Sequence, residues 1–151
     1  MLLHDAALSF LHFTFALILV GALVAEAFIL RLPVDGRVAR LLLRADLFYG
    51  ISAVGVIAAG LARVFWGMKG ADYYAAQPFF WAKMAVFAVI GLISILPTWA
   101  FISWVKQAGK DVAFAPTYAE VKRIRRFVMI EVHLLALLAL FAALMARGIG
   151  S

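Results

Sequence analysis

The sequence contains no cysteine, and only 15% of its 151 residues are charged. The absence of cysteine excludes disulfides, thiolate nucleophiles, iron–sulfur clusters and cysteine-ligated zinc. The shortage of charge accompanies 67% hydrophobic residues and a mean hydropathy of +1.05, values that are atypical of soluble globular domains. The composition therefore predicts an integral membrane protein whose main partner is the lipid bilayer.

Motifs of soluble enzymes are also absent. We find no P-loop, Rossmann glycine pattern, zincin helix or serine nucleophile elbow, and the sequence leaves open whether the chain is an enzyme. The net charge of +6 is compatible with nucleic-acid binding. The basic residues, however, lie beside apolar stretches, where they are typical of topology signals that face anionic lipid. We therefore expect no nucleic-acid partner.

Four apolar stretches are long enough to cross a membrane, since about 20 helical residues span a hydrocarbon core of about 30 Å. The expected spans are approximately residues 6–30, 45–66, 79–104 and 124–146. They predict a single integral membrane domain, 1–151, of the all-α class. Its expected fold is a four-helix transmembrane bundle with antiparallel, up-down-up-down order.

Basic residues are distributed unevenly among the three links between these spans. The link after the second span has Lys69 as its one basic residue. The other two links and their flanks are rich in arginine and lysine: Arg31, Arg37, Arg40, Arg44, Lys106, Lys110, Lys122, Arg123, Arg125 and Arg126. By the positive-inside rule, the first and third links face the cytoplasm. We therefore expect a multi-pass protein of the bacterial inner (plasma) membrane with both termini outside.

Two further features predict helix geometry. Pro97 removes one backbone donor within the third span and is expected to bend it, with Ser94 and Thr98 near enough to satisfy freed carbonyls. Small residues at four-residue spacing allow helices to approach closely. These pairs are Gly21/Ala25, Gly55/Ala59 and Ala139/Ala143.

Glu26, Asp46 and Glu131 lie within the spans, where ionisable groups are costly and therefore candidates for function. Counting along the helices places all three toward the cytoplasmic ends. The simpler interpretation is structural, because arginines at the ends of neighbouring helices are expected to pair with these acids. The alternative is a relay of protons between them.

His12, Arg63 and Lys83 are expected toward the outer side, and His133 near mid-membrane at nearly the depth of His12. Two histidines on antiparallel helices are able to supply both axial nitrogens to a haem b, so His12 and His133 are the candidate metal ligands. Arg63 and Lys83 would then pair with the haem propionates. The competing interpretation is that the cations extend to the interface and the histidines bond neighbouring helices.

Several local motifs resemble those of a known family. They are Arg44-Ala45-Asp46 with Tyr49-Gly50, Lys69-Gly70 and Met145-Ala146-Arg147-Gly148. Over essentially the whole chain the sequence resembles a bacterial family of uncharacterised predicted membrane proteins, domain of unknown function twenty-two-fourteen. This resemblance implies a four-pass membrane fold and no particular activity.

A more distant similarity is to the HemJ-type protoporphyrinogen oxidases. These proteins place a histidine on the first helix and a Trp-x-Lys motif on a later one, as His12 and Trp81-Ala82-Lys83 do here. The resemblance implies that His12 is an axial haem ligand and that Lys83 lies near carboxylates of the tetrapyrrole.

Three functions remain in competition. The first is binding of haem or a porphyrin within the bundle. The second is a small proton-coupled transporter, which with only four helices would need to form a homodimer. The third is a noncatalytic membrane-assembly subunit, in which the polar residues serve packing and topology.

Overall fold

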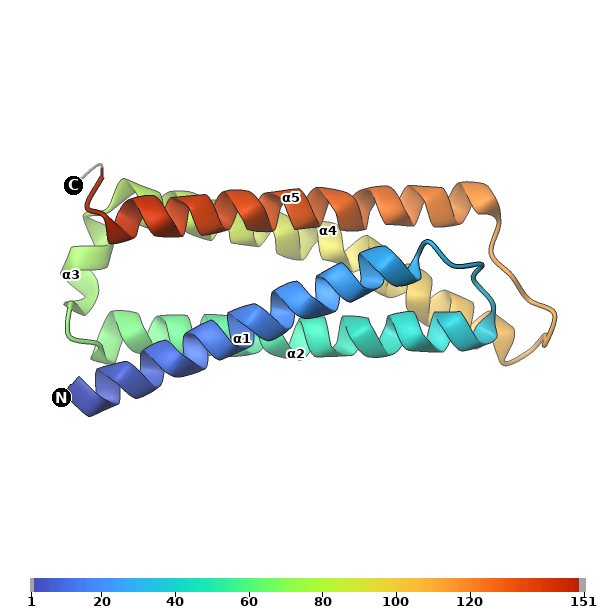
Figure 1. Ribbon diagram of the computed structural model, residues 1–151, viewed down its shortest axis with the longest axis horizontal. Helices are drawn as coiled ribbons and strands as arrows, with labels where there is room; N and C mark the ends of the chain where they lie inside the picture. Colours follow the sequence, from blue (N-terminus) through green and yellow to red (C-terminus); the bar gives the residue numbers. More distant parts are fainter. Residues whose placement is uncertain (1, 150–151) are drawn as a thin grey trace.

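The computed structural model describes residues 2–149 and is entirely helical over that range apart from its connections (Figure 1). The elements are α1 (Leu2–Ile29), α2 (Gly36–Trp66), α3 (Gly70–Ala75), α4 (Pro78–Ala108) and α5 (Tyr118–Ala146). All but α3 are long and apolar enough to cross a membrane, which confirms the predicted all-α class with four spans. The predicted domain 1–151 also includes Met1, Gly150 and Ser151, which lie outside the described residues.

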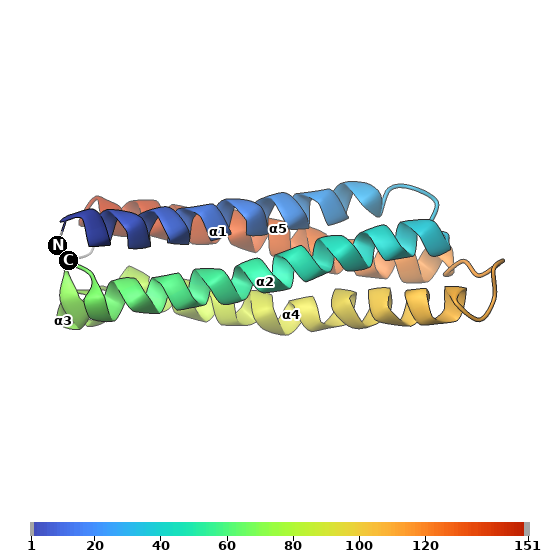
Figure 2. The same ribbon diagram turned by 90° about the horizontal axis from the view of Figure 1, so that it is seen from below.

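Consecutive long helices run in opposite directions (Figure 1). The start of α1, the end of α5 and α3 lie at one end of the bundle, called here the terminal end, and the 30–35 and 109–117 connections lie at the other, the loop end. Figure 2 shows α1 and α5 on one side and α2 and α4 on the other. Because α1 packs mainly against α2, and α4 mainly against α5, the fold consists of two helical hairpins placed side by side.

The helices extend beyond the predicted spans, mostly at the loop end. Spans were expected to begin at residues 45 and 124, whereas α2 and α5 begin at Gly36 and Tyr118. At both starts a side chain caps the helix, since Asp35 accepts a hydrogen bond from the backbone N–H of Val38 at 2.7 Å and Thr117 accepts one from that of Glu120 at 3.3 Å. Arg37, Arg40, Lys122 and Arg123 thus lie within the helices and not in the connections.

The connection at the terminal end contains the short helix α3, which the sequence analysis did not predict. Gly70, its first residue, has a φ of +74°, a conformation that favours glycine. The segment is held on both sides: the Met68 backbone N–H donates to Asp5 of α1 at 3.2 Å, and the Trp81 indole of α4 donates to the Ala75 carbonyl at 3.0 Å.

The core is narrow, and large apolar side chains lie both inside and outside it. Leu42, Phe101 and Trp104 are completely buried, whereas Phe10 and Trp99 are largely exposed. Apolar side chains on the outer surface are what a bilayer requires of a membrane bundle. The buried Trp104 indole also donates to Glu120 at 2.8 Å, which ties α4 to the first turn of α5.

Two packing predictions have mixed outcomes. A Cβ atom at Gly55 would lie 2.5 Å from the ring of Phe15, so this glycine does permit close approach of α1 and α2, whereas nothing lies within 4 Å of the corresponding point at Gly21. Near the buried Pro97, Ser94 donates to the Gly91 carbonyl of its own helix at 2.9 Å. The Thr98 hydroxyl donates to Asp46 of α2 and not to a carbonyl of its own helix.

Candidate functional site

Three buried carboxyl groups lie inside the bundle, on α1, α2 and α5. Glu26 and Glu131 are each 1% exposed and Asp46 is 7% exposed. They are close enough for Asp46 and Glu131 to act electrostatically on Glu26. We call Glu26, Asp46 and Glu131 the acid cluster. Helix α1 ends three residues after Glu26, short of the loop end (Figure 1), which places its last turn level with the interior of α2.

Two hydroxyl groups donate to the acid cluster. The Tyr49 hydroxyl donates to Oε2 of Glu131 at 3.0 Å, and the Thr98 hydroxyl donates to Oδ1 of Asp46 at 2.8 Å. Asp46 and Tyr49 are one helical turn apart on α2, so both face the same side of that helix. The cluster therefore receives contributions from all four long helices.

The expected arginine partners are not found. Among the described residues no lysine or arginine forms an ion pair with the acid cluster, whose polar contacts are instead those with Tyr49 and Thr98. One oxygen of Glu26 and one of Glu131, Oε1 in each case, are buried without any hydrogen-bond partner in the described part of the chain. Buried carboxyl oxygens without donors are costly, so this is the least satisfied polar region of the bundle.

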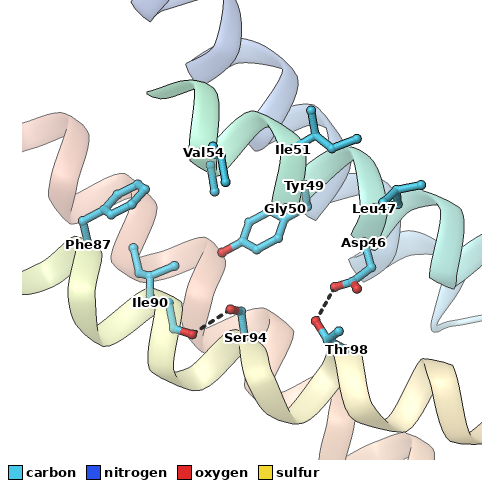
Figure 3. Close-up of a pocket in the computed structure, with 12 residues that line it drawn as sticks. Asp46, Leu47, Tyr49, Gly50, Ile51, Val54, Phe87, Ile90, Ser94 and Thr98 are labelled. Carbon is cyan, nitrogen blue, oxygen red and sulfur yellow. Dashed lines mark hydrogen bonds between the residues drawn. The ribbon is translucent and has the colours of Figure 1, made fainter. Parts of the chain in front are cut away.

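Asp46 also lines an open cavity between α2 and α4 (Figure 3). The cavity has a volume of about 430 Å³, and Asp46 and Thr98 meet across one part of it while Val54 and Phe87 line another. A second cavity of about 450 Å³ shares Asp46 and Thr98 and reaches Arg40 and Arg44 toward the loop end. Asp46 is thus the member of the acid cluster nearest to the outside.

His12, Arg63 and Lys83 form a second polar group near the terminal end, called here the basic cluster. They lie on α1, α2 and α4, all are partly buried, and both cations act electrostatically on His12. The ring of His12 bonds the Val56 carbonyl through Nδ1 at 3.1 Å and packs beside Gly60. Arg63 has a buried Nε without a hydrogen-bond partner among residues 2–149. The structure therefore brings these three candidates together.

His133 does not join them. Its side chain is exposed on the outer surface of α5, and its Nδ1 bonds the Met129 carbonyl of the same helix. His12, in contrast, lies against α2. The two histidines were expected at similar depths as axial ligands of one haem, but they do not face a common interior space. Over residues 2–149, no group of three or more histidine, aspartate and glutamate side chains is arranged to hold a metal ion.

Two members of the site, Tyr49 and Thr98, were not predicted from the sequence. Tyr49 was noted only as part of a motif, and Thr98 only as a partner for its own helix near Pro97. The spacing of Asp46 and Tyr49 was the available signal, because residues three apart share a helix face. No sequence signal paired Thr98 with Asp46, since their hydrogen bond joins residues 52 positions apart.

A family model described as "Predicted membrane protein (DUF2214)" matches residues 4–150. No curated protein and no solved structure matches the chain, so the similarity to HemJ-type protoporphyrinogen oxidases is not shown.

Proposed function

This chain belongs to the DUF2214 family of predicted membrane proteins, and we propose that it binds and releases protons inside the membrane as a small proton-coupled carrier. The observation that supports this function is the acid cluster. Three carboxyl groups from three helices are buried together there, and none of them forms an ion pair with a lysine or arginine of residues 2–149.

Electrostatics favours protons as the partners of this cluster. Like charges close together in an apolar interior repel strongly, and desolvation of each carboxylate adds to the cost. Uptake of a proton removes one of these charges and also supplies a donor. Such a donor has acceptors at hand in the unpaired Oε1 atoms of Glu26 and Glu131.

The route for exchange starts at Asp46, because this residue lines the cavities that open between α2 and α4. Asp46 acts on Glu26 electrostatically, and Glu26 and Glu131 lie deeper. The titratable groups that face the cluster are therefore Glu26 from α1, Asp46 and Tyr49 from α2, and Glu131 from α5, while α4 contributes the hydroxyl of Thr98.

The basic residues around the loop end favour a cytoplasmic position for that end in a bacterial inner membrane. In this orientation Asp46 exchanges protons with the cytoplasmic side. A carrier with four spans is expected to work as a homodimer, which would complete a path to the other side.

Proton movement is measured with the full chain reconstituted in liposomes that contain a pH-sensitive dye, under an imposed potential. We expect proton flux above that of empty liposomes, and its loss in Glu131→Gln and Glu26→Gln. Asp72→Asn is the matched control, because Asp72 is an exposed acid of α3 outside the cluster.

A folded Glu131→Gln variant with undiminished flux would contradict the proposal. Infrared difference spectra provide a second measurement, since a protonated carboxyl has its own C=O band. If no such band is seen, or if the band persists in both Glu26→Gln and Glu131→Gln, the cluster does not hold protons. Without flux and without such a band, the role of a noncatalytic assembly subunit gains support.

A second candidate function is binding of a carboxylate-bearing tetrapyrrole, such as haem b, at the basic cluster. The convergence of His12 with Arg63 and Lys83 favours it, because the two cations suit propionates and the histidine suits the metal. The exposed position of His133 leaves His12 as the candidate ligand. The test is the absorption spectrum of protein from haem-replete cells, with a Soret band expected and its loss in His12→Ala.

A further inference from the structure

The seam between α2 and α4 carries a groove on the outside of the bundle. Its two cavities, of about 430 and 450 Å³, share Asp46, Leu47 and Thr98 and are therefore continuous. The groove opens toward lipid, since Leu47 and Val54 on its edge are 60% and 67% exposed. The groove is present because α2 and α4 pack against each other less extensively than the two helices within each hairpin do.

The chemistry of the groove changes in order along its length. At the loop end it is lined by Arg40 and Arg44, which are both exposed. Beyond them Thr98 and Asp46 form its polar middle, and from there to Val54 and Phe87 the lining is almost entirely apolar (Figure 3). The order from cationic through polar to apolar matches that of an anionic headgroup, its ester linkage and an acyl chain.

The length of the groove matches one leaflet of a bilayer. From Arg40 to Val54 the α2 backbone rises about 21 Å. Half of a bilayer with its headgroups measures roughly 20–22 Å. The arginines lie at the loop end, so the groove reaches from the headgroup level of that leaflet to about the middle of the membrane.

Glycines keep the apolar part of the groove wide. Gly50 of α2 and Gly91 of α4 both line it, and no atom of residues 2–149 lies within 4 Å of the point where a Cβ would stand on either. Larger side chains at these positions would enter open space and not the packed core. The two glycines are therefore suitable positions for closing the groove without disturbing the fold.

We propose that this groove binds one anionic phospholipid of the leaflet at the loop end. Its phosphate pairs with Arg40 and Arg44, and one acyl chain lies between α2 and α4 against Val54 and Phe87. The groove shares Asp46 and Thr98 with the proposed proton route, but lipid binding does not require proton movement and is measured without it. The bound lipid would cover the side of α2 that carries Asp46.

The test uses full-length, delipidated protein in detergent, with lipid occupancy read by native mass spectrometry. The probes are dioleoyl phosphatidylglycerol and dioleoyl phosphatidylcholine, which share acyl chains and differ in headgroup charge. Because each cation near an anionic headgroup contributes a factor of about five, we expect phosphatidylglycerol to bind roughly twentyfold more tightly. The preference should fall to near unity in the double variant Arg40→Gln/Arg44→Gln.

Two matched controls separate this site from general effects. Arg123→Gln/Arg126→Gln removes the same charge from exposed positions of α5 at the same end of the bundle and should leave the preference intact. Gly91→Phe should weaken binding of phosphatidylglycerol severalfold, whereas Gly21→Phe, also at an open position but on α1, should not. Circular dichroism verifies that each variant is folded.

Several outcomes would overturn the proposal. Equal binding of the two lipids, or equal loss in the α2 and α5 arginine variants, would indicate only general surface attraction. Full displacement by inorganic phosphate alone would show that the acyl chain makes no contribution. A dimer that forms as lipid is removed, and that Gly91→Phe disrupts, would assign the groove to a second copy of the chain.

Discussion

The hydroxyl of Tyr49 on α2 donates a hydrogen bond to Glu131 on α5, a residue 82 positions further along the chain. The two helices are diagonally opposite in the bundle, since α2 has α1 and α4 as its long neighbours and α5 has the same two. The Tyr49 side chain therefore reaches across the centre of the bundle and donates to one oxygen of Glu131, whose other oxygen has no hydrogen-bond partner among residues 2–149.

Substitution Tyr49→Phe should destabilise the protein by about 1–3 kcal/mol, because it leaves both oxygens of a buried carboxyl without a donor. The measurement is thermal unfolding in detergent. Tyr73→Phe is the control: the Tyr73 hydroxyl takes part only in an exposed hydrogen bond with Lys69, so its loss should change stability by no more than about 0.5 kcal/mol. Equal effects of the two substitutions would refute this assignment.

Thr98→Val should also destabilise the protein by about 1–3 kcal/mol, since it keeps the shape of the side chain but removes the donor to Asp46. Thr98→Ser retains the hydroxyl and should recover most of the loss. Ser94→Ala, one turn away on the same helix, removes a bond to the helix's own carbonyl and should cost less. Denaturant unfolding of the three variants ranks them, and a different order would contradict the prediction.

Gly55→Ala should weaken the α1–α2 hairpin by about 1–3 kcal/mol, because the added methyl group meets the ring of Phe15. Gly21→Ala introduces the same group where nothing lies within 4 Å. It should be neutral or slightly stabilising, as alanine favours helix. Unfolding midpoints of both variants in one detergent provide the comparison, and a Gly55→Ala midpoint at or above that of Gly21→Ala would be inconsistent with the close helix contact.

Asp35 should give the start of α2 a dependence on acid pH. The backbone N–H of Val38 holds the pKa of this exposed carboxyl below its ordinary value of 3.8. Because the pKa is lower in the folded state than in the unfolded state, the cap contributes its full stability above the ordinary pKa of Asp35. This contribution is lost as the pH falls through the lowered pKa.

Thermal unfolding followed by circular dichroism between about pH 5 and pH 2 measures this loss of stability. Asp35→Asn keeps a side-chain acceptor but does not titrate, so it should remove this part of the pH dependence. Asp35→Ala should lower stability at neutral pH as well. Identical acid titrations of the natural chain and Asp35→Asn would show that the cap is not responsible.

The orientation in the membrane can be tested with single cysteines, because the chain has none of its own. Val112→Cys lies at a fully exposed position of the loop end, and Met68→Cys lies at an exposed position of the terminal end. We expect an impermeant thiol reagent to label Met68→Cys in intact cells and Val112→Cys only after the membrane is opened. The reverse pattern would place both termini in the cytoplasm.

The number of spans could be predicted from sequence, because it depends on the length of each apolar stretch. The direction of a side chain around its helix could not. In these helices the lipid-facing and core-facing sides are equally apolar, so Phe10 is exposed and Phe101 is buried without any difference in pattern. His133 was therefore a candidate to pair with His12 across the bundle, yet its side chain is exposed on the surface of α5.

The same limit applies to the acids. Their depth predicted a polar group near the loop end, but arginines were expected to complete it. Arg44 is only two residues from Asp46 on α2, and residues at that spacing on a helix do not face each other. Among the described residues, Asp46 and Glu131 instead accept hydrogen bonds from Thr98 and Tyr49.

The division of the fold into two hairpins has a consequence for assembly. Both hydrogen bonds of the acid cluster cross between the hairpins, Tyr49 to Glu131 and Asp46 with Thr98. Apolar contact alone gives little specificity, because apolar helix faces pack about as well against lipid as against one another. Once each hairpin has inserted, these buried donors and acceptors therefore determine the position of one hairpin relative to the other along the bundle axis. Only one such position forms both hydrogen bonds.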